Sequence, residues 1–337
     1  MENQSETLSG APSRRASAAS PQFKLSRLAA ALVARREASV VAVLVVVFVG
    51  LSIASPYFLT VRNLANVAQQ ISVVGIVALG QALVIISGGL DLSVGSVIGL
   101  ASVSAALATA ATGSPFVGIV AAIGVGLVMG VANGLLVTRL RINPFIATLG
   151  TMSVARGSAM LLTNARPQAF DNWASFIGGG RIFGVPAQFI WLVLLTGAVW
   201  VFATRTRWGR NIYAMGDNAK AAIFAGIDTK RLTVFVFALC GTLAGFGGLL
   251  IAGLLNNANP NLGLGYELDV IAAVILGGVA LTGGRGGIPG VVAGAALMGL
   301  LRNGFVLLSV SAYWQTIVIG LVVLVAVGVD GARRTER

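Results

Sequence analysis

The chain has 337 residues, of which 56% are hydrophobic and only 10% are charged. This balance excludes a soluble globular domain of that length and predicts a protein that crosses a membrane several times. The net charge of +12 would suit a nucleic-acid-binding protein, but the cations lie in the tails and connections between apolar runs, so we expect no nucleic-acid partner. The absence of His and the single, intramembrane Cys argue against histidine-based catalysis and most zinc sites, so we expect no catalytic residue, no metal and no enzyme activity.

The N-terminal segment, residues 1–37, is rich in Ser, Ala, Arg and Lys and has no sustained apolar period, which predicts a disordered cytoplasmic tail. Residues 38–330 hold apolar runs that are mostly close to the roughly 20 residues a transmembrane helix needs. The predicted fold class is therefore an all-α polytopic membrane protein with about ten transmembrane helices. The predicted spans are 39–55, 65–86, 93–111, 116–137, 145–162, 185–203, 232–255, 268–281, 288–308 and 314–329.

The distribution of cations predicts the orientation of these spans, because short connections rich in Lys and Arg stay on the cytoplasmic side. A chain of ten spans that starts in the cytoplasm places 18 of the 23 Lys and Arg residues on the inner side. Both termini are therefore predicted to be cytoplasmic, including a short C-terminal tail at 331–337. Dropping or adding one span after residue 231 would place the basic C-terminal tail outside.

Glycine is frequent, with 44 residues, and it recurs at four-residue spacing along several spans. Small residues at this spacing let membrane helices approach closely, which predicts a compact helical bundle. The spaced glycines are Gly95 and Gly99; Gly126, Gly130 and Gly134; Gly241 and Gly245; and Gly290 and Gly294.

Two short segments match each other: GLDLSV at 89–94 and GYELDV at 265–270. In the predicted topology they begin helices at opposite faces of the membrane, which favours an inverted repeat of spans two to five and seven to ten. Capping of the helix that follows is one interpretation of the polar residues in these segments. The other is that the broken helix ends line a pathway for a polar solute. The residues concerned are Asp91, Ser93, Glu267 and Asp269.

Polar side chains are few inside the predicted spans, and such side chains should face the bundle interior or a wet cavity. Hydroxyl and amide groups with few charges favour an uncharged polar solute over an ion. Hydrogen bonds between neighbouring helices are the alternative role. The pathway candidates are Gln70, Thr148 and Thr151, and further polar residues in spans are Gln69, Gln81, Arg156, Ser158, Arg302 and Asn303.

The longest cation-rich connection, residues 208–231, is predicted to be cytoplasmic and to hold a short helix at 219–225. Asp217 or Asn218 would cap its start and Gly226 would end it. A basic helix of this kind can lie on the lipid surface, or it can dock in a groove on a soluble partner. The small residues on its face favour docking, and with a neighbouring cation they are Ala221, Ala222, Ala225 and Lys220.

Four stretches closely resemble the permease subunits of ribose-type sugar ABC importers. The resemblance implies that residues 209–227 dock on a separate cytoplasmic ATPase, which would hold ATP and Mg. It also implies a periplasmic sugar-binding protein that delivers the solute, a second permease subunit that encloses the pathway, and a location in the bacterial inner membrane. The stretches are GGLDLSVGS at 88–96, NPFIATLGTM at 143–152, GRNIYAMGDNAKAAIFAGI at 209–227 and NPNLGLGYELDVIAAVILGGVALTGGRG at 259–286.

Alternative functions require different sequence features. The chain has no G-x-x-x-x-G-K-[ST] loop, so ATP hydrolysis is expected on another polypeptide. An ion-coupled secondary transporter would need paired intramembrane carboxylates or basic groups, whereas the acids here fall at predicted span ends. An intramembrane hydrolase would need a nucleophile with its base. A branched-chain amino-acid permease belongs to the same superfamily and stays open as an alternative.

Overall fold

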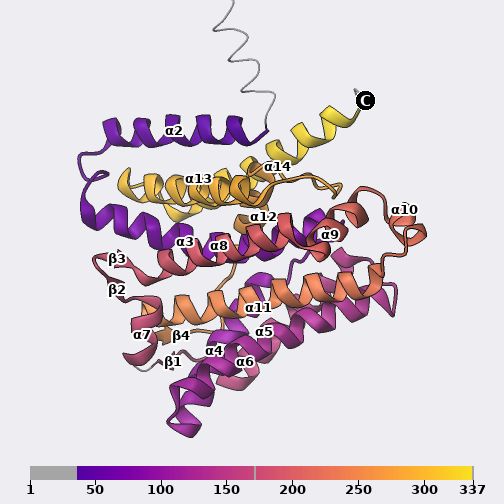
Figure 1. Ribbon diagram of the computed structural model, residues 1–337. Helices are drawn as coiled ribbons and strands as arrows, with labels where there is room; N and C mark the ends of the chain where they lie inside the picture. The colour runs from indigo at the N-terminus through magenta and orange to yellow at the C-terminus, as the bar shows by residue number, and fades with distance from the viewer. Residues whose placement is uncertain (1–35, 171, 336–337) are drawn as a thin grey trace, which may run out of the picture.

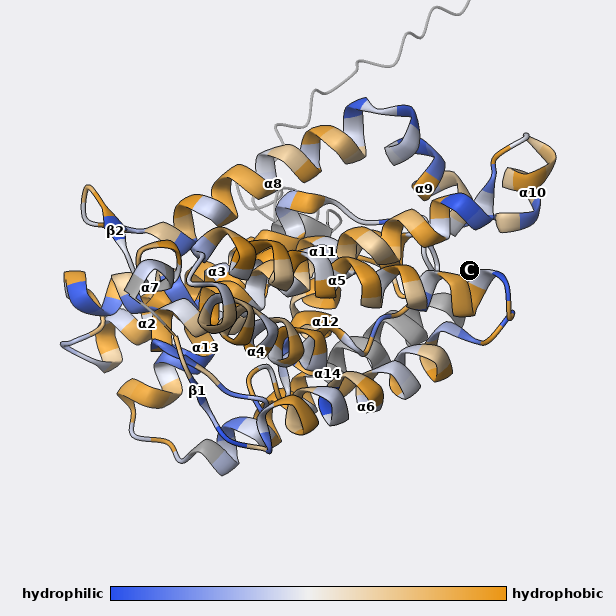
Figure 2. Ribbon diagram, turned by 90° about the horizontal axis from the view of Figure 1, so that it is seen from below, coloured by the Kyte–Doolittle hydropathy of each residue, from blue (hydrophilic) through white to orange (hydrophobic). Residues whose placement is uncertain are grey.

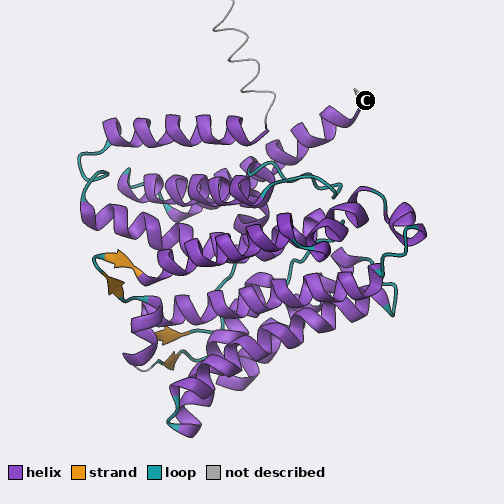
Figure 3. Cartoon of the chain, in the orientation of Figure 1, coloured by secondary structure: helices purple, strands orange, loops and turns teal. Residues whose placement is uncertain are grey.

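The computed structural model describes residues 36–170 and 172–335. Helices account for most of this part of the chain, and four two-residue strands form two small antiparallel pairs (Figure 3). The predicted N-terminal tail lies outside the described residues, except for its last two positions, which belong to the first described helix. At the other end, the last helix reaches Thr335, so most of the predicted C-terminal tail continues that helix.

Each of the ten predicted spans coincides with a helix. Seven of the described helices are long and apolar enough to cross a membrane, and α2 and α14 contain shorter apolar stretches. The polytopic all-α fold is therefore confirmed, with about ten spans as an approximate count. The ten helices are α2 (Arg36–Ala54), α3 (Val61–Ile86), α4 (Val94–Thr112), α5 (Pro115–Thr138), α6 (Pro144–Thr163), α8 (Ala187–Arg205), α11 (Thr229–Leu255), α12 (Tyr266–Leu276), α13 (Ile288–Leu307) and α14 (Ala312–Thr335).

Helix α12 is shorter than its predicted range of 268–281, because it has only 11 residues. Its last residue is Leu276, and Gly277 is the C-cap. Gly278 follows with a φ of +88°, a left-handed conformation that glycine adopts without strain and that stops a helix. An 11-residue helix is about half the length needed to cross the hydrocarbon core. The chain on either side of α12 must therefore cover the remaining depth as irregular backbone, which is tolerated where protein surrounds it.

The connections gather at two opposite ends of the bundle (Figure 1). One end holds α7 (Asn172–Gly178) and the paired strands, with β1 (Gln168–Ala169) antiparallel to β4 (Asn257–Ala258) and β2 (Arg181–Ile182) antiparallel to β3 (Val185–Pro186). The other end holds α9 (Arg207–Asp217), α10 (Ala219–Phe224) and the described C-terminus. Figure 2 shows that hydrophilic residues concentrate towards these ends, whereas the long helices between them are mainly hydrophobic.

Helix α3 lies at the centre of the bundle. In its most apolar window, 83% of the residues are buried inside the protein, against 22% for α5 and 28% for α6 and α8. Large side chains such as Ile76, Leu79 and Leu83 are fully buried on α3. Helices α5, α6 and α8 therefore form much of the outer surface that meets lipid or another subunit.

The spaced glycines of α5 and α11 mark a close crossing of these two helices, as the glycine spacing predicted. Gly126 on α5 faces the backbone carbonyl of Gly241 on α11 so closely that no Cβ atom fits on either residue. One turn further, Gly130 lies against the backbone of Phe237 and Ala238. These contacts bring the α5 and α11 backbones together, which gains dispersion energy where lipid offers no hydrophobic driving force.

Candidate functional site

Helices α9 and α10 form a bent unit, here called the elbow, at the end of the molecule that holds the described C-terminus (Figure 1). Thr206 caps α9 by accepting a hydrogen bond from the amide of Gly209 at 3.0 Å. Asn218 caps α10 by accepting one from the amide of Ala221 at 3.0 Å. Gly226, with a φ of +79°, ends the unit. Of the two predicted caps, Asn218 therefore takes the role, and Asp217 is the last residue of α9.

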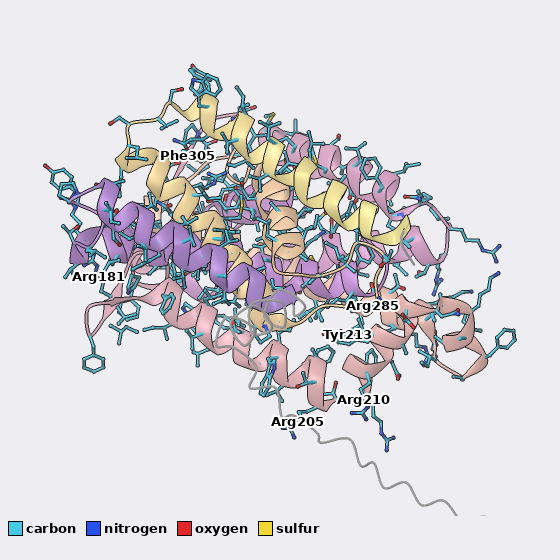
Figure 4. The ribbon with its side chains drawn as sticks, turned by 90° about the horizontal axis from the view of Figure 1, so that it is seen from above. Arg181, Arg205, Arg210, Tyr213, Arg285 and Phe305 are labelled. Atoms are coloured by element: carbon cyan, nitrogen blue, oxygen red, sulfur yellow. The ribbon has the colours of Figure 1, made fainter. Side chains whose placement is uncertain are left out.

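The outer surface of the elbow is basic and partly apolar. Arg205 and Arg210 project from this end, and Arg285 lies beside Tyr213 (Figure 4). The predicted surface residues Lys220, Ala221 and Ala225 are exposed on or beside α10, as is Asp217. Next to them, Ile223 is 57% exposed and Phe224 is 92% exposed. An apolar tip of this kind, rimmed by charge, is typical of a contact surface for another protein or a membrane.

Ala222 requires a correction to the predicted docking face. Its side chain is only 3% exposed and packs in the main hydrophobic core of this chain. It therefore cannot enter a groove on a partner from this conformation, although the spacing of Ala221, Ala222 and Ala225 suggested one shared face. A short helix buries the side that faces its own protein, and here that side includes Ala222. The exposed neighbours Ile223 and Phe224 carry most of the apolar area that a partner could bury.

A buried polar cluster holds the segment that leads into α4. Asp91 is 1% exposed and accepts hydrogen bonds from the amide and the hydroxyl of Ser93, at 2.8 and 2.6 Å. Asn133 on α5 donates to the hydroxyl of Ser93 at 2.9 Å, and its own carbonyl accepts from Thr151 on α6 at 2.6 Å. With its side-chain amide turned over, the orientation that satisfies both of its polar atoms, Gln81 on α3 pairs with the backbone amide and carbonyl of Asp91, at 3.2 and 3.1 Å.

This cluster joins α3, α5 and α6 to the start of α4. Asp91 does not cap α4 directly, because the residue at the N-cap position is Ser93. The side chain of Ser93 makes no capping hydrogen bond. Asp91 instead fixes the turn that precedes the helix, and its charge lies near the positive end of the α4 dipole. Fully satisfied networks of this kind rigidify a protein interior.

The other intramembrane candidates have separate surroundings. Thr148 donates to the carbonyl of Pro144 at 2.8 Å within α6 and lies 3.3 Å from the carbonyl of Leu90. Gln70 on α3 is half-buried, and its side-chain oxygen has no hydrogen-bond partner among the described residues. Thr148 therefore adjoins the Asp91 segment, whereas Gln70 belongs to another part of α3. The role of each in contacting a solute stays a prediction.

The start of α12 carries a second group of charges. Asp269 is 1% exposed and forms an ion pair with Arg302 of α13, whose guanidinium also lies 5.9 Å from the centre of the Tyr266 ring. Glu267 interacts electrostatically with Arg156 of α6, which donates a hydrogen bond to the carbonyl of Pro260 at 3.1 Å. Gly265, with a φ of +82°, stands at the N-cap, so neither acid caps α12 with its side chain. Both lie in the first turn, where the helix dipole favours negative charge.

The starts of α4 and α12 meet inside the bundle. Gly95, in the first turn of α4, lies against a carboxylate oxygen of Glu267 and the carbonyl of Gly263, with no room for a Cβ atom. Gly99, one turn later, faces the carbonyls of Pro260 and Leu262. The two matching sequence segments are therefore brought together in space, as helix starts that approach the same interior region. The inverted relation between the two halves stays a prediction.

Two pairings were not foreseen from the sequence. Asn63 on α3 and Asn303 on α13 exchange side-chain hydrogen bonds at 3.0 and 2.7 Å, and both residues are buried. The partner of Arg302 was also missed, although an intramembrane cation requires one, and the acids near the start of the eighth span were the available candidates. Helix α9 was missed as well, although Ile212 and Met215 lie at helical spacing after Thr206, a residue type typical of an N-cap.

Comparison with known proteins places this architecture in a family. The family described as branched-chain amino acid transport system / permease component matches residues 63–327. The ribose import permease protein RbsC of Escherichia coli (strain K12) is 41% identical over 302 residues, which cover 88% of this chain and 94% of that protein. The L-arabinose ABC transporter permease protein AraH of Azospirillum brasilense is 36% identical over 300 residues, or 88% of each chain.

The D-allose transport system permease protein AlsC of Escherichia coli (strain K12) is 35% identical over 295 residues, which cover 86% of this chain and 89% of that protein. No solved structure matches the chain at a significant level. The matches span nearly the whole bundle, including the elbow and both internal helix starts. This chain therefore belongs to the ABC importer permease family and is a multi-pass membrane protein of its ribose-type branch.

Proposed function

We propose that this chain is the membrane-spanning subunit of an ABC importer and forms the pathway for a ribose-like monosaccharide. The proposal rests on the similarity to the ribose import permease, which extends over 88% of the chain at 41% identity. The relatives named for arabinose and allose share less identity, at 36% and 35%. Few charges and several hydroxyl and amide groups inside the spans agree with an uncharged, polyhydroxylated solute.

The orientation follows from the two ends of the bundle. The elbow end carries the dense cation run, which the positive-inside rule assigns to the cytoplasm. The opposite end, with α7 and the short strands, would then face the periplasm of a bacterial inner membrane. A periplasmic sugar-binding protein would deliver the solute there. A second permease subunit, identical or closely related, would complete the pathway, because α5, α6 and α8 leave most of their surface uncovered in this chain.

The elbow is the proposed contact for the cytoplasmic ATPase, which would bind ATP and Mg. The anchor is Phe224, whose side chain is 92% exposed on a well-defined six-residue helix. An exposed aromatic residue that inserts in a pocket of a partner commonly carries a large share of binding energy. The cations around it would mainly affect the association rate and its salt dependence. A helix that only rests on lipid is the alternative interpretation of the same surface.

The transport proposal is tested by reconstitution. The chain is placed in proteoliposomes with the ATPase and binding protein of its importer, and uptake of labelled D-ribose is compared with that of labelled L-leucine. ATP-dependent uptake of ribose is expected, with none for leucine. Uptake of leucine alone would support the branched-chain amino-acid alternative. Uptake driven by an ion gradient without ATP would contradict the ABC assignment.

The docking proposal is tested by co-purification of the ATPase. Phe224→Ser should weaken ATPase retention, because loss of a buried aromatic anchor costs about 2 kcal/mol or more of binding free energy. The matched control is Phe183→Ser, since Phe183 is fully exposed at the opposite end of the molecule. Equal retention of the ATPase by both variants would contradict docking through Phe224. Such equal retention would favour the alternative in which the helix rests on lipid.

A further inference from the structure

The inner face of α9 contacts two distant segments of the chain through their backbones. The amide of Gly284, in the connection between α12 and α13, donates a hydrogen bond to the carbonyl of Ile86 at 2.8 Å. Gly216, in the last turn of α9, lies against both groups, and a Cβ atom on it would sit 2.6 Å from the amide nitrogen of Gly284. Ile86 is the last residue of α3. Three chain segments therefore meet here with no side chain between them.

The connection from α12 is shaped to make this contact. Gly283 has a φ of +86° and Gly284 a φ of +71°, which other residues adopt only with strain. A Cβ atom on Gly284 would also lie 2.7 Å from the backbone nitrogen of Asp217 at the end of α9. Both the backbone conformation and the space thus require glycine. The close approach is a property of the local sequence and not a chance contact of long side chains.

A side chain strengthens the same contact. The hydroxyl of Tyr213 donates a hydrogen bond to the carbonyl of Gly286 at 2.9 Å. Tyr213 and Gly216 are three residues apart on α9, so they share one face of the helix. Figure 4 shows Tyr213 next to Arg285, which belongs to the same connection. This face of α9 therefore holds the segment after α12 at two points, and the end of α3 at one.

The segment after Ile86 leads directly to the start of α4, whereas the connection after α12 reaches the start of α12 through that 11-residue helix. Five residues after Ile86 the chain reaches Asp91, which the buried polar cluster holds at the start of α4. The connection at 277–287 follows α12, whose first turn carries the Asp269–Arg302 pair. Close-packed protein interiors are stiff, so a displacement at one end of such short segments is passed to the other. Physically continuous contacts of this kind can carry energetic coupling between two sites.

We propose that the face of α9 formed by Tyr213 and Gly216 transmits movement of the elbow to the starts of α4 and α12. This inference rests on the proposed function, in which an ATPase moves the elbow. Tyr213 is a positioning residue in this mechanism, since it acts through the backbone of Gly286 and contacts no solute. The exposed surface of the elbow around Phe224 binds the ATPase, whereas its inner face couples that binding to the pathway.

The test separates binding of the ATPase from coupling. Tyr213→Phe removes the hydroxyl and keeps the ring, and the complex is reconstituted with the ATPase and the binding protein. We expect unchanged ATPase co-purification and an unchanged melting temperature. The amount of labelled D-ribose imported per ATP hydrolysed should fall by about 3- to 10-fold, the range that loss of one hydrogen bond produces in an equilibrium. Tyr57→Phe, at an exposed tyrosine in the connection between α2 and α3, is the matched control and should have no effect.

A second pair of variants addresses the backbone contact. Gly284→Ala should lower the coupling ratio more than Tyr213→Phe does, because it adds a Cβ atom where the φ is positive and the space is filled. Gly197→Ala is the control, since a Cβ atom on this glycine of α8 meets nothing within 4 Å. An unchanged coupling ratio in Tyr213→Phe and Gly284→Ala would overturn the inference. A fall in ATPase retention parallel to the fall in uptake would overturn it too. If the unmodified protein neither retains the ATPase nor imports ribose, the result contradicts the proposed function instead.

Discussion

The ion pair between Asp269 and Arg302 allows a sharp prediction, because its two partners differ in burial. The Asp269 side chain is 1% exposed, whereas that of Arg302 is 35% exposed. Arg302→Met leaves a buried carboxylate without its cation, a change that costs about 3 to 5 kcal/mol of unfolding free energy. The dipole of α12 favours this carboxylate by at most about 2 kcal/mol. Desolvation of the unpaired charge therefore dominates.

Asp269→Asn removes the carboxylate and leaves Arg302 without its ion-pair partner. Arg302 stays partly exposed, can still donate to the new amide carbonyl, and keeps its position near the ring of Tyr266. We expect a loss of about 1 to 3 kcal/mol, the usual cost of weakening a buried hydrogen-bonded pair. The double variant Arg302→Met with Asp269→Leu removes both charges, and hydrophobic replacements of a buried pair are often neutral or stabilising.

Thermal unfolding of the purified protein in detergent measures the order of these effects. The melting temperature should fall most in Arg302→Met and less in Asp269→Asn, and the double variant should recover most of the loss. A double variant that melts below both single variants would show that the pair is not the source of the effect. A larger loss in Asp269→Asn than in Arg302→Met would refute the argument from burial.

Three further predictions follow from the packing and topology. Gly126→Ala should destabilise the protein by about 1 to 3 kcal/mol by overpacking the contact with α11, whereas Gly124→Ala, at a position with open space, should not. Equal melting temperatures of the two variants would contradict the close contact between α5 and α11. Asp91→Leu should lose about 1 to 3 kcal/mol because the donors of Ser93 lose their acceptor, whereas Asp91→Asn should retain most of the stability; equal expression and transport of the two variants would exclude this role. An impermeant thiol reagent applied to intact cells should label Phe183→Cys and leave Phe224→Cys unlabelled, and the opposite result would reverse the orientation.

The sequence predicted the parts of the fold that depend on local composition. Apolar runs identified all ten predicted spans, and the cap residue Asn218 occupies the position expected of it. The glycine spacing identified the α5–α11 crossing. These features follow from residues that are close in the sequence, so periodicity and turn chemistry are sufficient to find them.

Contacts between distant residues were not predictable in the same way. Asn63 and Asn303 lie 240 positions apart, and nothing local in either segment indicates the other. Ala222 was assigned to the wrong side of α10, because spacing defines which residues share a face but not which face the protein buries. The short α12 was overestimated because the apolar run continues past Gly277, whereas the left-handed Gly278 ends the helix. The sequence therefore located the connection at 208–231 and the helix α10 in it, but neither α9 nor the inner contacts of the elbow.

The central claim is that the elbow is the place where an ATPase engages this permease. A cysteine at Phe224, modified with a benzophenone photo-crosslinker, tests this claim most directly in the assembled complex. The native Cys240 is fully buried and should not react with the reagent. We predict a crosslink to the ATPase from position 224 and none from position 183 at the opposite end. A crosslink to the ATPase from position 183, or none from position 224 in an intact complex, would contradict the account.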